Sequence, residues 1–138
     1  MNWFSSSKTT EYVNFEDVQK AIERPAEYYI VNTLPFHVQD CLIQTTLDAS
    51  QEERAINTMM NSLSVEDRKI IIYGKHSNDE SVEQKAHQFM RLGMNDVFVY
   101  KGGMFEWLTL QDIYGEAHFP TTKQVLDILK YKPPRKFN

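Results

Sequence analysis

The sequence has little cysteine: Cys41 is the only one among 138 residues. A single thiol excludes an intramolecular disulfide, and it excludes zinc sites built from four cysteines or from two cysteines and two histidines. Such low cysteine usage is typical of a reducing compartment, so we expect a cytoplasmic protein. Any thiol chemistry of this chain would have to use Cys41 itself.

Long apolar runs and an excess of positive charge are also missing. No stretch approaches the roughly 20 apolar residues that a membrane-spanning helix needs, and the first residues lack the pattern of a secretory signal. Lysine and arginine number 15 against 19 for aspartate and glutamate, which gives a formal net charge of −4. A dedicated nucleic-acid-binding surface needs a basic balance, so this composition disfavours nucleic acid as the main partner and offers no sign of a membrane partner.

What is present fits one globular domain. Hydrophobic residues make up 41% of the chain, and a domain of this length can bury on the order of two-thirds of its unfolded surface. We therefore expect folding without a metal ion and without a cofactor. We place an N-terminal extension at 1–12, one domain at 13–129, and a basic tail at 130–138 that two prolines interrupt.

Four short runs rich in β-branched or aromatic residues predict strands. They comprise residues 28–31, 41–43, 70–73 and 97–100. The run at 70–73 reads Ile-Ile-Ile-Tyr, and such an uninterrupted apolar run is typical of a strand that is covered on both faces.

Capping residues predict where two helices begin. Asn14 is the expected N-cap of the first helix, which Pro25 ends. Ser50 and Glu53 form a capping box for the second helix, and the apolar residues of that helix fall on one face. That face consists of Ala55, Ile56, Met59, Met60 and Leu63.

Two further helices are expected. Ser81 and Gln84 make another capping box, and Gly93 ends the helix that follows them. The last helix is predicted to start at Thr121 or Thr122. This alternation of strands and helices predicts an α/β fold with a mostly parallel central sheet and helices on both faces.

In a parallel sheet, ligands bind beyond the carboxyl ends of the strands. The polar loop after the strand at 70–73 occupies that place and is our candidate binding site. It consists of Gly74, Lys75, His76, Ser77, Asn78, Asp79, Glu80 and Ser81. Its amides could hold an anion, but Asp79 and Glu80 already offset the helix dipole, so we expect a self-satisfied cap.

The motifs around this loop follow a distinctive order. A polar loop that begins at Gly74 leads to a helix that ends at Gly93, and a short strand then leads to Gly102-Gly103 and Trp107. This order resembles the rhodanese-like domain family, and the resemblance covers about residues 13–110. It implies a rhodanese-like three-layer domain.

The resemblance also implies which chemistry is missing. Active members of the family begin the loop with a cysteine that carries sulfur as a persulfide, and an arginine often assists. Here Gly74 stands in the cysteine position, and no arginine lies between Gly74 and Ser81. The usual Asp-x-Arg after the first strand reads Asn32-Thr33-Leu34. The chain thus resembles an inactive member without catalytic residues, similar to members in protists and large DNA viruses.

Three functions remain open on this basis. We expect a protein-binding or regulatory module that uses the loop and a second patch, although the commoner role of such an apolar patch is to close the core. The patch comprises Gly102, Gly103, Phe105 and Trp107. A sulfurtransferase or sulfur carrier that uses Cys41 is the first alternative. A nucleic-acid-associated factor that binds through the tail at 130–138 is the second.

Overall fold

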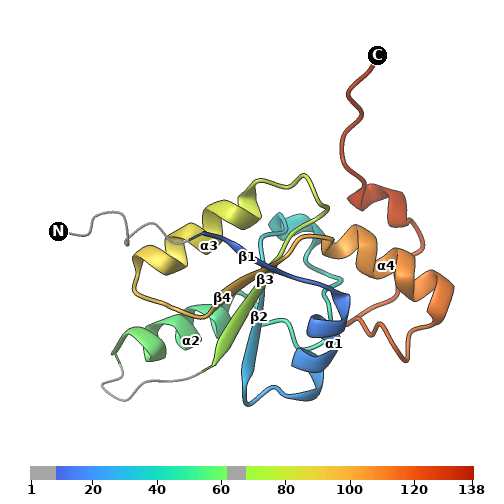
Figure 1. Cartoon of the computed structure of the whole chain (residues 1–138). Helices are drawn as coiled ribbons and strands as arrows, with labels where there is room; N and C mark the ends of the chain where they lie inside the picture. The colour runs from blue at the N-terminus through green and yellow to red at the C-terminus, as the bar shows by residue number, and fades with distance from the viewer. Residues whose placement is uncertain (1–8, 62–67) are drawn as a thin grey trace.

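Four short strands form one parallel sheet in the computed structural model, which describes residues 9–61 and 68–138 (Figure 1). They are β1 (Glu11–Val13), β2 (Tyr28–Asn32), β3 (Lys69–Tyr73) and β4 (Val97–Tyr100), and their order in the sheet is β1-β4-β3-β2. Each neighbouring pair is parallel, which requires crossover connections that return the chain to the same end of the sheet. The parallel sheet predicted from the sequence is confirmed.

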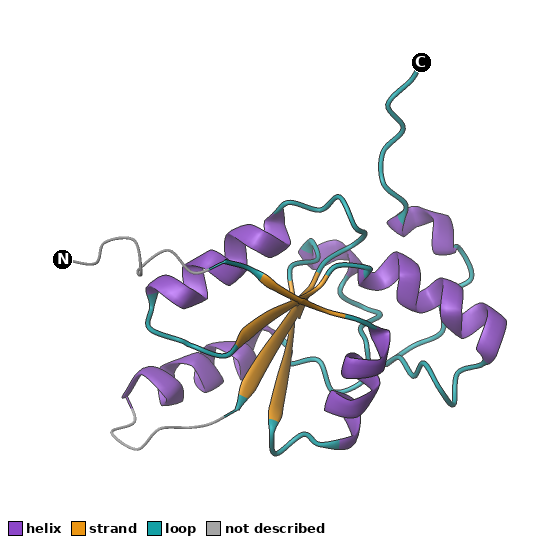
Figure 2. Ribbon diagram, in the orientation of Figure 1, coloured by secondary structure: helices purple, strands orange, loops and turns teal. Residues whose placement is uncertain are grey.

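Helices on both faces supply these crossovers (Figure 2). The α-helices are α1 (Phe15–Glu23), α2 (Ala49–Asn61), α3 (Ser81–Arg91) and α4 (Gly103–Tyr114), and two 3-10 helices are η1 (Phe36–Val38) and η2 (Ile128–Tyr131). Buried residues of α1 and α4 belong to one core cluster, whereas those of α3 belong to the other, where residues of α2 also pack. The fold therefore has three layers, with the sheet in the middle.

The central strand β3 contributes to both cores. Ile71 and Tyr73 enter the core under α1 and α4, while Ile70 and Ile72 enter the core under α3. All four side chains are almost completely buried. Because successive residues of a strand point to opposite faces, a strand covered on both faces has no solvated position. This explains the uninterrupted apolar run.

The N-cap of α1 is the one that the sequence predicts. The Asn14 side chain accepts hydrogen bonds from the amides of Glu16 and Asp17, and the Asp17 carboxylate accepts from the Asn14 amide at 3.0 Å. This reciprocal capping box satisfies backbone donors that have no partner within the helix. The helix ends at Glu23, before Pro25, as expected.

The predicted cap of α2 is wrong by two residues. The helix begins at Ala49, and Asp48 and Gln51 form the capping box in place of Ser50 and Glu53. The Asp48 carboxylate accepts from the Gln51 amide at 2.8 Å, and the Gln51 side chain accepts from the Asp48 amide at 2.9 Å. Both segments have capping-box spacing, and the structure uses the one that begins two residues earlier. Leu63, expected on its apolar face, lies outside the described residues.

Two further predictions, a strand at 41–43 and a helix from Thr121 or Thr122, are also wrong. Residues 41–43 form no strand: Ile43 makes a single antiparallel bridge to Thr121. No α-helix begins at Thr121 or Thr122, because Thr122 forms hydrogen bonds with the backbone of Leu42 instead. The Thr122 amide donates to the carbonyl of Leu42 at 2.8 Å, and the Leu42 amide donates to the Thr122 hydroxyl at 3.0 Å. Only η2 follows.

The folded body includes residues at both of the expected domain boundaries. Glu11 and Tyr12, placed in the N-terminal extension, belong to β1 and pair with β4. Tyr131, placed in the tail, is fully buried. Within the described part of the chain, none of the helices combines the length and apolar character needed to cross a bilayer.

Candidate functional site

The loop from Gly74 to Ser81 lies at the carboxyl end of β3, where the register of the sheet brings several strand ends together. Asn32 pairs with Tyr73, and Tyr73 pairs with Tyr100, so β2, β3 and β4 end side by side. A hollow of about 540 Å³ opens beside the loop. It is lined by Thr33, Pro35, Lys75, His76, Asn78, Asp79, Glu80, Ser81 and Pro134.

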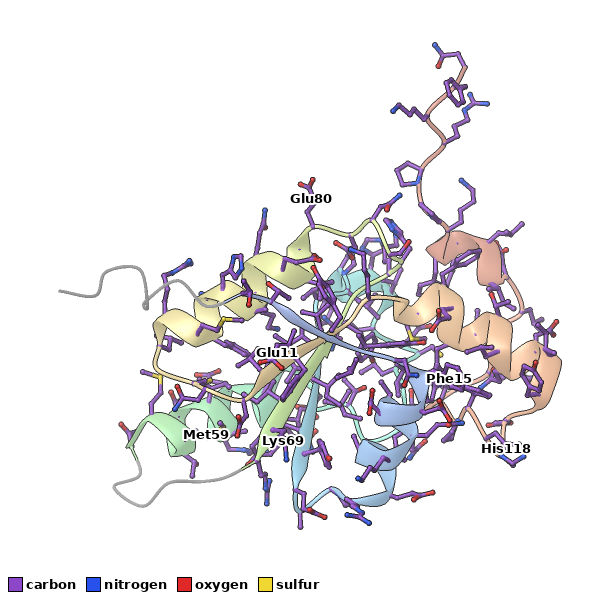
Figure 3. The ribbon with its side chains drawn as sticks, in the orientation of Figure 1. Glu11, Phe15, Met59, Lys69, Glu80 and His118 are labelled. Atoms are coloured by element: carbon purple, nitrogen blue, oxygen red, sulfur yellow. The ribbon has the colours of Figure 1, made fainter. Side chains whose placement is uncertain are left out.

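Three separate segments meet at this hollow. The loop supplies one wall, the residues that follow β2 supply another, and Pro134 comes from the C-terminal segment. Figure 3 shows Glu80 projecting outward at this end of the molecule, on the side from which the C-terminal residues leave the body. Thr33, Pro35 and Pro134 were missed by sequence reasoning. The sequence could have pointed to Thr33, because Thr33 lies in the segment that departs from the family's Asp-x-Arg pattern. No sequence pattern indicates that Pro134 reaches the hollow.

The Asp79 carboxylate fills the inside of the loop. It accepts hydrogen bonds from the Lys75 amide at 2.9 Å, from the Ser81 amide at 3.1 Å and from the Ser81 hydroxyl at 2.5 Å. The same hydroxyl lies 2.8 Å from the hydroxyl of Thr33. Amides that could hold an external anion therefore already hold an internal one.

This arrangement corrects the predicted cap of α3. Ser81 is the first helical residue, and the side chain that accepts from its amide is that of Asp79, so the capping box of Ser81 with Gln84 is wrong. A carboxylate accepts charge-assisted hydrogen bonds, which are stronger than those of a serine hydroxyl. Of the two acids expected to satisfy this helix end, Asp79 accepts the hydrogen bonds, whereas the Glu80 side chain makes no capping hydrogen bond.

Several groups together lower the pKa of Asp79. Burial by itself would raise this pKa, because it disfavours the charged form, but hydrogen bonds from Lys75 and Ser81 act in the opposite direction and outweigh it. The carboxylate is thus ionised at neutral pH.

We expect Asp79→Asn to lower the free energy of unfolding by about 2 kcal/mol at neutral pH, because an amide cannot replace an ionised acceptor of three hydrogen bonds. The folded-state pKa lies below the unfolded-state value of about 3.9. The stabilisation is therefore fully present above that value and is lost as the pH falls through the folded-state pKa. Urea unfolding of both proteins at a series of pH values measures this difference.

The matched control for this prediction is Glu80→Gln. Glu80 is the neighbouring residue, and its side chain makes no capping hydrogen bond to α3. We expect this change to alter stability by less than about 0.5 kcal/mol. A stability gap between Asp79→Asn and the parent protein that stayed constant down to the lowest pH would contradict the assigned role of the Asp79 carboxylate.

The two glycines at the start of α4, Gly102 as its N-cap and Gly103 as its first residue, bring this helix against the loop. The Met104 amide donates to the carbonyl of Gly74 at 2.9 Å, and the Phe105 amide donates to that of Lys75 at 2.8 Å. Gly103 has a φ of +68°, and a Cβ there would lie 2.7 Å from the Gly74 oxygen. Only glycine permits both this conformation and this close approach.

Gly102 makes room for a second contact. A Cβ at this position would lie 2.5 Å from the carboxylate of Glu106, which accepts a hydrogen bond from the Tyr100 hydroxyl at 2.6 Å. Burial and this carboxylate both raise the pKa of Tyr100. The Gly-Gly motif thus has a structural cause, the close packing of the start of α4 against the loop that begins at Gly74.

The second patch expected from the sequence is mostly inside the protein. Trp107 and Gly103 are buried, while Gly102 and Phe105 are half-buried. The Trp107 ring packs edge-on against Tyr100 and Phe119, and its Nε1 donates to the carbonyl of Pro120 at 3.2 Å. Trp107 and Gly103 are therefore core residues that no partner reaches, and α4, for which no helix was predicted, is the element that buries them.

Cys41 is also inside the protein. Its exposed fraction is 0%, and its thiol donates a hydrogen bond to the carbonyl of Lys123 at 3.3 Å. Burial raises the pKa of this thiol, although the hydrogen bonds to Lys123 and Thr121 counteract it in part. A protonated and enclosed thiol is a poor nucleophile.

A metal centre also lacks support. Within the described ranges, no three histidine, cysteine, aspartate or glutamate side chains lie close enough to share a metal ion.

The comparisons with known proteins agree on the fold. A family model described as the rhodanese-like domain matches residues 17–110. No curated protein matches the chain. The solved structure of the rhodanese-like domain of the Alr3790 protein from Anabaena has a TM-score of 0.56 and 20% identity, and the match covers 94% of this chain and 89% of that one.

Two other similar structures come from proteins with named activities. A single-domain sulfurtransferase from Saccharomyces cerevisiae has a TM-score of 0.55 and 17% identity, with 78% of this chain and 96% of that chain covered. An As-Sb reductase from Leishmania major has a TM-score of 0.55 and 14% identity, with 78% of this chain and 81% of that chain covered. At these identities the likeness shows the fold alone, and the residues of the site must decide the chemistry.

Proposed function

Since this chain belongs to the rhodanese-like domain family, we propose that it is a member without sulfurtransferase activity that works as a protein-binding or regulatory module. One observation carries this proposal. The position at which the resemblance expects a sulfur-carrying cysteine is Gly74, and a Cβ there would lie 2.5 Å from an Asp79 carboxylate oxygen. The site lacks the side chain and also the space for one.

The remaining contacts of Gly74 support this proposal. The same Cβ would lie 2.6 Å from a methyl carbon of Val82 and 2.8 Å from the hydroxyl oxygen of Thr33. These neighbours belong to three segments, namely α3, the loop and the residues that follow β2. The family's covalent chemistry has no acceptor atom at this position.

The burial of Cys41 argues against the main alternative. A sulfur carrier must present its thiolate to a donor and to an acceptor, whereas this thiol is fully enclosed and hydrogen-bonded to a backbone carbonyl. Use of Cys41 would require the segment around Lys123 to open first.

The surface that we assign to partner binding is the rim of the hollow beside the loop. Ser77, Asn78 and Glu80 are exposed, and Lys75 and His76 are half-buried. Loops at the carboxyl ends of parallel strands are where binding residues gather in α/β folds. The rim therefore keeps the location of the family's site after losing its nucleophile.

We expect no transfer of sulfur from thiosulfate to cyanide above the rate in buffer. The wild-type protein and Cys41→Ser should be indistinguishable in this assay, since neither holds an accessible thiolate. Thiocyanate formation measures the reaction, and a cysteine-containing rhodanese serves as the positive control. Activity in the wild type that disappears in Cys41→Ser would overturn the non-catalytic assignment.

Affinity purification with quantitative mass spectrometry tests the binding role. The loop variant changes Lys75 and Glu80 to alanine, and the matched control changes Lys20 and Glu23 to alanine on α1, at the other end of the sheet. All four are charged surface residues, so each pair removes one positive and one negative charge. We expect the loop variant alone to lose partners, and equal recovery by both variants would contradict the assigned surface.

A further inference from the structure

The segment at 122–131, which we call the strap, covers the only thiol of the protein. The Cys41 thiol donates a hydrogen bond to the carbonyl of Lys123 near the start of the strap, and the fully buried Tyr131 stands at its end. Between these two residues, η2 lies beside α4 (Figure 1). The family model matches residues 17–110, so the chain encloses its thiol with residues that this match does not include.

A small set of interactions holds the strap on the body. Among the described residues, the hydrogen bonds that join the two are made at Thr122 and Lys123. Within 122–130, Val125 and Ile128 are half-buried and every other side chain is exposed. The exposed side chains include Leu126, so part of the apolar surface of the strap contributes nothing to its attachment.

A firmly packed anchor precedes the strap. Phe119 is buried against the ring of Trp107, whose Nε1 donates to the carbonyl of Pro120. The Gln111 side-chain amide donates to the hydroxyl of Thr121 at 3.1 Å. Segments with few buried contacts open at a lower free energy than well-packed elements. The strap can therefore leave the body while the anchor stays in place.

The hydroxyl of Tyr131 works against closure of the strap. It is buried and has no hydrogen-bond partner among the described residues, and burial of an unpaired hydroxyl costs free energy. The buried hydroxyl of Tyr73, by comparison, accepts from the Ile43 amide at 3.1 Å and lies 2.8 Å from the Thr46 hydroxyl. Burial, with a smaller contribution from the nearby Cys41, raises the pKa of Tyr131 to about 12.

We propose that the strap opens as a unit while the domain stays folded, and that this opening makes Cys41 a site for exchange with small disulfides. The closed form predominates, and the open form is a minor state. In the open form the thiol gives its proton to solvent, and the thiolate attacks one sulfur of the disulfide. A bond forms between the Cys41 sulfur and that atom, and the other half of the disulfide leaves as a thiolate. Cys41 is thus oxidised, and the leaving half is reduced.

The modified side chain cannot return to the place of the thiol. Cys41 is completely enclosed in the closed form, and a mixed disulfide adds a whole group to it. Protein interiors are close-packed and leave no room for such a group. The strap therefore stays displaced until a reductant removes the group, so disulfide exchange becomes a reversible conformational switch. This inference goes beyond the proposed binding function and does not depend on it.

Reaction with dithiobis(nitrobenzoate), an aromatic disulfide, at a series of urea concentrations tests the opening. The coloured thiolate that is released reports the rate. Opening of the strap alone exposes little surface, so the rate at low urea should depend only weakly on urea. It should also exceed, by at least about tenfold, the rate that the measured global unfolding equilibrium permits. A rate that follows global unfolding at every urea concentration would show that the strap does not open by itself.

Two substitutions in the strap should change this rate in opposite directions. Thr122→Val removes the acceptor of the Leu42 amide and should speed the reaction by about tenfold, whereas Tyr131→Phe removes the unpaired hydroxyl and should slow it by about tenfold. The matched control is Thr10→Val just before β1, where the hydroxyl lies 3.2 Å from Nε2 of His87; it should change the rate by less than about twofold. A faster reaction of Tyr131→Phe, or no effect of Thr122→Val, would contradict the assigned latch.

Hydrogen exchange followed by mass spectrometry locates the change in the modified protein. After reaction with the same disulfide, residues 122–131 should lose protection while β2, β3 and β4 keep it, and dithiothreitol should restore the original pattern. Cys41→Ser, treated identically, should show no change. A modified protein with a fully protected strap would overturn the switch, and loss of protection throughout the sheet would show unfolding of the domain instead of opening of the strap.

Discussion

Replacing Gly74 with cysteine is expected to destabilise the protein by about 3 kcal/mol instead of restoring a sulfur-carrying site. The new Cβ would lie 2.5 Å from the Asp79 carboxylate oxygen and 2.6 Å from a Val82 methyl carbon. Carbon atoms in real contact stay about 3.5 Å apart or more. The loop must therefore move, and its movement disturbs the hydrogen bonds that the Asp79 carboxylate accepts.

Urea unfolding of Gly74→Cys and mass spectrometry after treatment with thiosulfate measure both parts of this expectation. Gly74→Ala is the matched control and should cost nearly as much, because the Cβ alone causes the overlap. Combining Gly74→Cys with Asp79→Ala should recover part of the loss, since it removes the nearest atom. A stable Gly74→Cys protein that forms a persulfide would show that the loop has room after all.

Replacing Trp107 with alanine is expected to lower the free energy of unfolding by about 4 kcal/mol. The indole is completely buried and packs edge-on against Phe119, with ring centroids 5.0 Å apart. Its removal leaves a cavity between α4 and the residues around Phe119, and it leaves the carbonyl of Pro120 without the hydrogen bond from the indole.

Chemical denaturation of Trp107→Ala measures this loss, and Trp107→Phe separates its causes. Phenylalanine keeps an aromatic ring but cannot donate to Pro120, so we expect it to cost about 1.5 kcal/mol. If Trp107 were an anchor for a partner, the alanine variant would keep the stability of the parent protein and lose only binding. Unchanged stability would thus contradict the assignment of Trp107 to the core.

Hydrogen bonds within the protein hold the shape of the loop from Gly74 to Ser81. In this chain, a carboxylate takes the amides that would otherwise surround an external anion. The carbonyls of Gly74 and Lys75 are bound by the first amides of α4. The loop therefore holds its conformation without a ligand, which suits a rigid surface for a partner.

Much of the fold could be predicted because β2, β3, β4 and α1 depend on local patterns, whereas β1 was missed. The run at β3 is apolar at every position that the sheet buries, and Asn14 caps α1 with atoms only a few residues away. The missed helix α4 lacks such a local signal. It packs against both the sheet and η2, so its apolar residues do not form one clear stripe.

By itself, the sequence determined that a sulfur-carrying side chain is absent at Gly74 and that Cys41 is the only thiol. Only the tertiary structure decided that the thiol is enclosed, that Asp79 fills the place of a side chain at Gly74, and that Pro134 reaches the same hollow. The reason is physical: a residue type is a local property. Enclosure, overlap and proximity depend on segments that are distant in sequence and meet only when the sheet and its helices pack together.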